Sequence, residues 1–163
     1  FSDFARMPKP ILKDNDLVLI IKDNINLLRE LDQNIDIELY FNKKIIMLNS
    51  DNEQLSRVFL NLIKNSIESI QEKSLNTVDF KGKISLEIND NHNYIEFIIT
   101  DNGVGFEGFK NDIKNILNPY FTTKEKGTGL GLAIVNKIIN DHNGLINFRS
   151  TIDGAKILIK FTR

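Results

Sequence analysis

The glycine-rich stretch KGTGLGLAIVNKI places Gly127, Gly129 and Gly131 within five residues, at the point where a helical pattern begins. Backbone N–H groups at the start of a helix, with no Cβ in the way, can approach an anion closely, and the helix dipole favours negative charge there. The alternative is a loop that only has to turn, because glycine is the usual residue where the backbone needs a positive φ. The stretch therefore suggests phosphate binding without establishing it.

Two other stretches have residue types that could contact a ligand. Asn61 and Asn65 in FLNLIKNSIES share one face of a helix, which is also what an ordinary surface helix shows. In TDNGVGF, Asp101 follows a predicted strand and precedes Gly103 and Gly105. A carboxylate at the rim of a sheet could read an exocyclic amine beside a flat ring that lies against the glycines, although Asp-Asn-Gly is also common turn chemistry.

The glycine stretch does not fit the two best-known phosphate-binding motifs. No GxxxxGK[ST] sequence is present, which excludes a Walker A loop. The dinucleotide-binding pattern fails because Leu132 stands where its third glycine belongs and no strand precedes the stretch.

The elements that must position these residues follow from hydrophobic periodicity. In the first half of the chain, a helix is predicted from Asp16 to Leu31. Two strands follow, IDIELYF and IIMLN, joined by the polar turn Asn42 to Lys44. A long helix is then capped by Asp51 and ends near Gln71. The second half predicts a hairpin of KISLEIN and YIEFIIT, an irregular stretch, the glycine-led helix to about Asp141, and a hairpin of LINFRS and AKILIKF. Hairpins with helices inserted between them predict an α+β, two-layer α/β sandwich, a mixed sheet with helices on one face.

Composition excludes several classes of function. The chain has 163 residues and a formal net charge of −1, which predicts one domain and argues against nucleic acid as a partner. The absence of cysteine excludes disulfides, thiolate metal sites and a cysteine nucleophile. The longest apolar run, LVLII, is too short to cross a bilayer. Because the sequence begins at Phe1 without a methionine, we expect it to be a piece of a longer protein.

Together, the three stretches resemble the N, G1 and G2 boxes of the Bergerat (GHKL, HATPase) ATP-binding superfamily in order and spacing, over about residues 11 to 163. NPYFTTK (Asn118 to Lys124) resembles the F box of sensor histidine kinases. FSDFARMPKP, residues 1–10, resembles the tail of their dimerisation helices, and the chain is most similar to the nitrogen-regulation (NtrY-like) type. The resemblance thus divides the chain into a linker at 1–10 and a catalytic ATP-binding domain at 11–163.

The resemblance assigns ATP and Mg²⁺ as cofactors and gives each stretch a role. Asp101 would accept the adenine amino hydrogen, with Gly103, Gly105 and Phe106 close to the ring. Asn65 would hold Mg²⁺ and Asn61 would support it, so that these two side chains carry the catalytic role. The phosphates would meet Lys124, in a mobile lid, and the backbone of Gly127, Thr128, Gly129, Leu130, Gly131 and Leu132.

By the same resemblance, the parent protein is a histidine kinase. It would transfer the ATP γ-phosphoryl group to a histidine on its own dimerisation domain, outside this chain, for relay to a response regulator. The parent is expected to be a homodimer anchored in the bacterial inner membrane, with this domain in the cytoplasm and not itself touching the membrane. His92 lies in a predicted turn and His142 at a helix end, where it could act as a C-terminal cation, so neither suits the phosphate acceptor.

Three alternatives remain. The first is an ATPase of the superfamily, but these proteins carry a glutamate as general base where this chain has Asn61. The second is an anti-sigma-type serine kinase, and the resemblance of Phe1 to Pro10 to a helix tail argues against it. The third is a module that binds nucleotide without catalysis, and the intact boxes argue against it. The chain also departs from the family pattern. Glu68 and Ser69 replace a basic or aromatic residue, which leaves the phosphate charge to Lys64 or Lys124, and Gly154 is followed by Ala155 where relatives often have a hydroxyl. A hydrogen bond to the nucleotide would then be missing.

Overall fold

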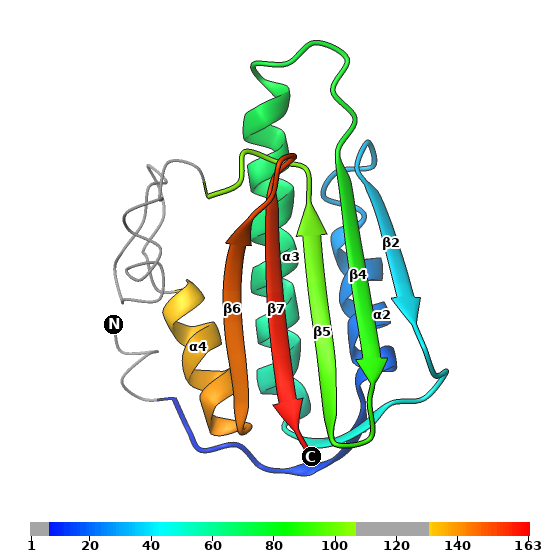
Figure 1. The fold of residues 1–163 in the computed structure, drawn as a ribbon, viewed down its shortest axis with the longest axis vertical. Helices are drawn as coiled ribbons and strands as arrows, with labels where there is room; N and C mark the ends of the chain where they lie inside the picture. The colour runs from blue at the N-terminus through cyan, green and yellow to red at the C-terminus, as the bar shows by residue number, and fades with distance from the viewer. Residues whose placement is uncertain (1–6, 107–130) are drawn as a thin grey trace.

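A computed structural model describes residues 7–106 and 131–163 of the chain. Its elements, drawn in Figure 1, are β1 (Lys13–Asp16), α2 (Leu17–Leu28), β2 (Asp36–Phe41), β3 (Met47–Ser50), α3 (Asn52–Ser74), β4 (Lys83–Asp90), β5 (Tyr94–Asp101), α4 (Gly131–Asp141), β6 (Gly144–Ser150) and β7 (Ala155–Thr162). None of the described helices is both long and apolar enough to cross a membrane.

The main sheet has five strands in the order β2-β4-β5-β7-β6. β2 pairs with β4 in parallel and the other neighbours are antiparallel, so the sheet is mixed. Helices α2, α3 and α4 lie side by side behind one face of this sheet (Figure 1). The two-layer α+β sandwich expected from the sequence is confirmed.

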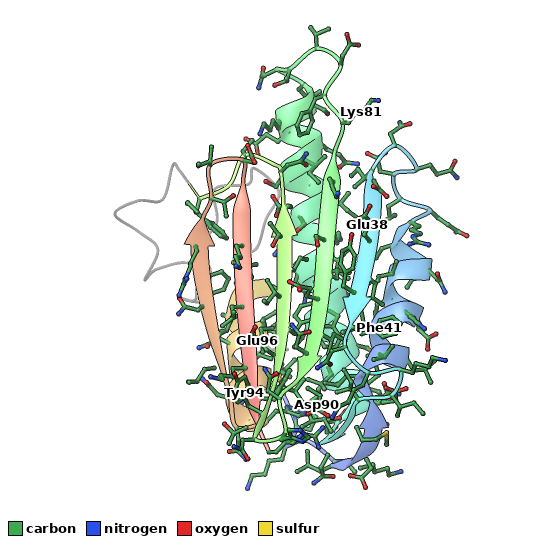
Figure 2. All side chains as sticks on the ribbon, turned by 45° about the vertical axis from the view of Figure 1, so that its right-hand side comes forward. Glu38, Phe41, Lys81, Asp90, Tyr94 and Glu96 are labelled. Atoms are coloured by element: carbon green, nitrogen blue, oxygen red, sulfur yellow. The ribbon has the colours of Figure 1, made fainter. Side chains whose placement is uncertain are left out.

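The strands alternate between the core and the open face of the sheet. In β5, Ile95, Phe97 and Ile99 are buried under the helices, and the Phe97 ring lies 4.9 Å from that of Phe59 on α3. On the other face of the sheet, polar side chains such as Glu38 and Glu96 stand at intermediate exposure (Figure 2). One side of the sheet therefore holds the core, as period-two alternation requires.

The pairing of the third strand differs from the sequence expectation. The segments on either side of Asn42 to Lys44 do not form a hairpin, because β3 pairs antiparallel with β1, a strand the sequence did not predict. Hydrogen bonds to Asp16 favour this pairing of β3 with β1. The Asp16 carboxylate accepts from Val18 N, at the start of α2, and from Ile46 N, just before β3. The segment just before β3 is thus held at the beginning of α2 and not beside β2.

The boundaries of the long central helix agree closely with the sequence. Asp51 is the N-cap of α3, as predicted, and its side chain accepts a hydrogen bond from Gln54 N at 3.1 Å. The helix ends at Ser74, three residues beyond the predicted Gln71. The first helix, in contrast, ends at Leu28 and not at Leu31.

His142 fastens the end of α4 to the beginning of α3. Its ring is 6% exposed, and Nε2 accepts a hydrogen bond from Asp51 N at 3.0 Å. Nδ1 therefore carries the proton and donates it to the carbonyl oxygen of Ile138, 2.8 Å away. The ring therefore joins two backbone groups at the end of α4. The ring is also unsuited to accept a phosphoryl group, since both nitrogens are engaged.

We predict that His142→Phe lowers the free energy of unfolding by about 1–3 kcal/mol, because the ring volume stays while the part-buried Asp51 N–H group loses its acceptor and the Ile138 carbonyl loses one of its two donors. Urea unfolding followed by circular dichroism measures the change. His92→Asn is the matched control, since His92 is exposed with a φ of 64° that asparagine tolerates. Equal stability of the two variants would contradict the role given to His142.

Candidate functional site

Asp101 is a buried carboxylate at the last position of β5, 6% exposed. Burial raises the pKa of Asp101 above its usual value, and hydrogen bonds from Gly103 N, the Ser66 hydroxyl and Ala155 N partly oppose this increase, as does the charge of Lys73. The bond from Gly103 N measures 2.9 Å. The carboxylate is thus a fixed hydrogen-bond acceptor at the rim of the sheet.

The residue after Asp101 bridges back to the start of the neighbouring strand. The Asn102 side chain accepts from Lys83 N at 2.8 Å and donates to Lys81 O at 2.9 Å. Its backbone N–H also donates to Lys83 O. These bonds hold the chain at the point where it leaves β5 and leave Asp101 in register with Ile84.

Gly103 packs directly against α3. A Cβ at this position would lie 2.3 Å from Ser69 Oγ and 2.7 Å from the Ser69 carbonyl carbon, so no side chain fits. Ser69 Oγ also accepts a hydrogen bond from Val104 N at 3.0 Å. The residue that departs from the family pattern therefore holds the loop, and its small size permits the contact.

Gly105 and Gly154 bring the last hairpin against the same loop. Gly105 has a φ of +69°, and a Cβ there would lie 2.6 Å from Gly154 O. A Cβ on Gly154 would in turn lie 2.2 Å from Asp101 O. Beside them, the rings of Phe106 and Phe148 meet edge to face with centroids 5.8 Å apart. The segment after β5 is therefore enclosed by α3 and by the β6–β7 hairpin.

A second group of predicted site residues lies where α3 meets α4. A Cβ on Gly131, the first residue of α4, would lie 3.9 Å from Asn61 Oδ1, so the amide and the helix start are neighbours. Asn65 is one turn further along α3 and is half-buried. Leu132 is partly buried and packs against the core. The structure thus brings Asn61 close to Gly131, the last glycine of the stretch.

Several predicted site residues lie outside the part of the chain that the structure describes. They are Lys124, Gly127, Thr128, Gly129 and Leu130, together with the NPYFTTK stretch and residues 1–6. Their roles stay predictions.

Three residues that contact the site were not singled out by the sequence as its parts. Ser66, Ser69 and Lys73 follow one another at helical spacing along α3, and each contacts Asp101 or the segment after it. The only sequence signal for them is that spacing, i, i+3 and i+7, on the side of the helix next to the Asn61 and Asn65 stripe. Among the described residues, no group of three or more His, Cys, Asp or Glu could hold a metal ion.

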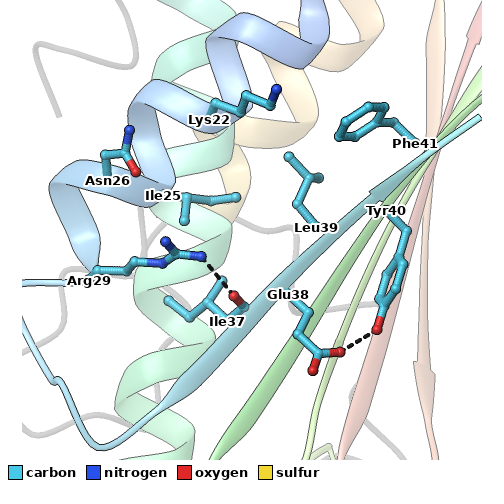
Figure 3. A pocket seen from close by; sticks show the side chains of 9 residues that line it. All are labelled: Lys22, Ile25, Asn26, Arg29, Ile37, Glu38, Leu39, Tyr40 and Phe41. Carbon is cyan, nitrogen blue, oxygen red and sulfur yellow. Dashed lines mark hydrogen bonds between the residues drawn. The ribbon is translucent and has the colours of Figure 1, made fainter. Parts of the chain in front are cut away.

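A groove of about 590 Å³ lies elsewhere, between α2 and the edge strand β2 (Figure 3). Its walls include Ile25, Leu39 and Phe41, and Arg29 closes one side by donating to Ile37 O at 2.9 Å. It lies at the opposite edge of the sheet from β6 and contains none of the predicted site residues.

The match to a family model identifies this chain as an ATP-binding domain. Residues 50–162 match the model of the family "Histidine kinase-, DNA gyrase B-, and HSP90-like ATPase". The chain belongs to this family, and membership implies that it binds ATP.

Curated relatives extend the match to nearly the whole chain. It is 34% identical over 99% of its length to a putative sensor histidine kinase NtrY-like of Rickettsia conorii, and 34% identical over 99% to the nitrogen regulation protein NtrY of Azorhizobium caulinodans. The chain spans only 26% and 20% of these two proteins. The resemblance to NtrY-type kinases that the sequence suggested is confirmed.

Solved structures agree with the fold. The catalytic domain of histidine kinase ThkA superposes with a TM-score of 0.79 at 27% identity, covering 93% of this chain and 95% of that one. ThkA in complex with the response regulator protein TrrA superposes with a TM-score of 0.73 at 21% identity, covering 93% of this chain and 41% of that chain.

We predict that Gly103→Ala lowers the free energy of unfolding by about 1–3 kcal/mol, because its methyl group would overlap backbone atoms of Ser69 that cannot move alone. Gly131→Ala is the matched control. Its methyl group would stand at ordinary van der Waals distance from Asn61, so stability should not fall. Thermal unfolding of both variants tests the difference. If Gly103→Ala is as stable as the unmodified chain, the close contact with Ser69 does not limit stability.

We also predict a pH dependence of stability from Asp101. Because burial raises the pKa of its carboxyl in the fold, its contribution to stability is fully present below the ordinary pKa and is lost as the pH rises through the raised value. Urea unfolding between pH 4 and pH 7 should therefore depend less on pH in Asp101→Asn than in the parent sequence, since the amide does not titrate. If the pH profile of Asp101→Asn matches that of the unmodified chain, the pKa of Asp101 is not raised in the fold.

Proposed function

We propose that residues 11–163 form the catalytic ATP-binding domain of a sensor histidine kinase, with residues 1–10 as the end of its dimerisation helices. The observation that carries the proposal is the buried Asp101 carboxylate, held at the end of β5 by donors from α3, the following loop and β7. Such an acceptor fits a ligand that offers an N–H donor at the sheet rim.

Adenine is the base that this site would select. Its exocyclic amine would donate to Asp101, whereas guanine presents a carbonyl oxygen at the corresponding position and would oppose the carboxylate with a second acceptor. Phe106, which already meets Phe148 edge to face, would supply an aromatic surface close to the ring. Gly103 and Gly105 would serve by placing the loop close to α3 and Gly154.

The amides on α3 would serve the phosphate end of the nucleotide. Mg²⁺ takes oxygen ligands and is usually held by one or two protein groups together with substrate phosphates. Asn65 would be its protein ligand and Asn61 would support it beside Gly131, where α4 begins. Lys124 and the backbone from Gly127 to Leu132 would contact the phosphates, and bound Mg²⁺ would neutralise part of their charge.

The reaction is transfer of the γ-phosphoryl group to a histidine outside this chain. The bond between the γ-phosphorus and its bridging oxygen breaks, a P–N bond to the imidazole forms, ADP leaves and the imidazole proton passes to solvent. The sensor-kinase relatives and the complex of ThkA with TrrA support a response regulator as the next acceptor. The parent would be a homodimer anchored in the inner membrane.

An ATPase of the same family is the alternative, and one position on α3 favours the kinase. Hydrolysis needs a base to activate water, and the resemblance places that base where this chain has Asn61. An amide cannot accept the proton. A kinase needs only to position the nucleotide and its incoming nucleophile.

We predict that Asp101→Asn weakens binding of ADP by roughly 1–3 kcal/mol, because the amide would turn an NH₂ group either toward Gly103 N–H or toward the adenine amine. Titration calorimetry with ADP and GDP measures the effect. Asp79→Asn is the control, since Asp79 is an exposed loop residue with a φ of 56° that asparagine also adopts. Equal affinity of the unmodified chain for ADP and GDP would overturn the adenine assignment.

We predict that the chain alone, incubated with labelled ATP and Mg²⁺, neither labels itself nor hydrolyses ATP above a trace rate. It should phosphorylate a separately supplied dimerisation helix pair of its parent, because proximity and orientation are most of what this transfer requires. Asn65→Asp should abolish the transfer by disturbing the metal. Rapid hydrolysis by the unmodified chain would favour the ATPase reading, and label on His92 or His142 would place the acceptor inside this chain.

We predict that Asn61→Glu raises ATP hydrolysis, because the carboxylate supplies the base that the ATPases carry at this position. Asn61→Gln matches its length without the base and should leave hydrolysis at the trace rate. If both variants hydrolyse ATP equally slowly, the missing carboxylate is not what separates this domain from the ATPases.

A further inference from the structure

Lys73, in the last turn of α3, makes an unusual set of contacts. Its ammonium donates to three backbone carbonyls, Asn102 O at 3.0 Å, Gly103 O at 3.4 Å and Asp153 O at 3.0 Å. An ammonium has three donors, so every one is used. The side chain is half-buried, and Nζ also lies 5.1 Å from the centre of the Phe80 ring, whose face attracts a cation.

The three carbonyls belong to two segments that meet at Asp101. Asn102 and Gly103 follow it directly, whereas Asp153 lies in the turn between β6 and β7. Gly154, the next residue of that turn, packs against Asp101 O. Lys73 therefore joins the helix, the loop and the turn at one point, and its cation suits the C-terminal end of α3.

The charge of Lys73 also acts on Asp101. Burial makes ionisation of this carboxylate costly, and the Lys73 ammonium is among the groups that lower its pKa against that effect. Without the cation, Asp101 would hold its proton to a higher pH. A protonated carboxyl would meet the adenine amine less well, because one of its oxygens has become a donor.

We propose that Lys73 is a positioning residue for recognition of the base: by fastening Asn102, Gly103 and Asp153 around one ammonium, it holds the Asp101 carboxylate in place as a hydrogen-bond acceptor. This inference rests on the proposed function. Lysine suits the role better than arginine, because a tetrahedral ammonium can aim its hydrogens at carbonyls in three directions, whereas a guanidinium donates in one plane.

The test compares Lys73→Met, Lys73→Arg and the control Lys81→Met by calorimetric titration with ADP and GDP from pH 5 to pH 8. Lys81 has an exposed side chain, and its contact with Asn102 uses the backbone carbonyl, which methionine keeps. Lys73→Met should raise the Kd for ADP about tenfold, which is the scale of one lost hydrogen bond. It should also reduce the preference for ADP over GDP and move upward the pH below which ADP affinity falls. Lys81→Met should match the unmodified chain.

Lys73→Arg separates charge from geometry. It should keep the pH midpoint of the unmodified chain and still weaken ADP, and it carries the test if Lys73→Met does not fold. An arginine variant identical to the unmodified chain, or a methionine variant that weakens ADP and GDP equally at an unchanged pH midpoint, overturns the inference. Failure of the unmodified chain to prefer ADP would instead overturn the proposed function.

Discussion

A buried carboxylate must be matched by donors, and this requirement at Asp101 organises the surrounding structure. Its donors come from three separate places: Ser66 on α3, Gly103 in the following loop and Ala155 at the start of β7. Satisfying one side chain thus fixes the relative positions of a helix, a loop and a strand that are distant in sequence. The close contacts of Gly103 and Gly154 follow from the same convergence, because the backbones meet without room for side chains.

Helix α3 connects the two halves of the site. One stripe carries Asn61 and Asn65, and the adjacent stripe carries Ser66, Ser69 and Lys73. At 1.5 Å per residue, Asn61 and Lys73 are separated by about 18 Å along the axis. A single rigid element, packed against the sheet by buried residues such as Phe59, therefore sets the spacing between the group beside α4 and the group beside Asp101. In the proposed function, that spacing separates the phosphate end from the base.

Much of this arrangement could be predicted from sequence because it depends on local signals. The Asp51 cap and the alternation in β5 are local, and the order of the boxes indicated the family. The partner of β3 was not predictable from alternation, which reveals a strand but not its neighbour. The role of Lys73 was equally hidden, because its acceptors are backbone carbonyls from distant residues. The glycine spacing predicted space for a ligand beside Gly103. In the structure, Ser69 occupies the place where a side chain of residue 103 would stand.

The sheet order has a consequence for how the domain is made. β7 is the last described strand in the chain, yet it lies between β5 and β6 and not at an edge. During synthesis on the ribosome, β6 has no sheet neighbour until residues 155–162 have emerged, and Asp101 lacks the N–H of Ala155 until then. A premature stop before Ala155 would remove an interior strand. Truncated products should therefore expose sheet edges and be degraded, which leaves only complete domains to compete for nucleotide.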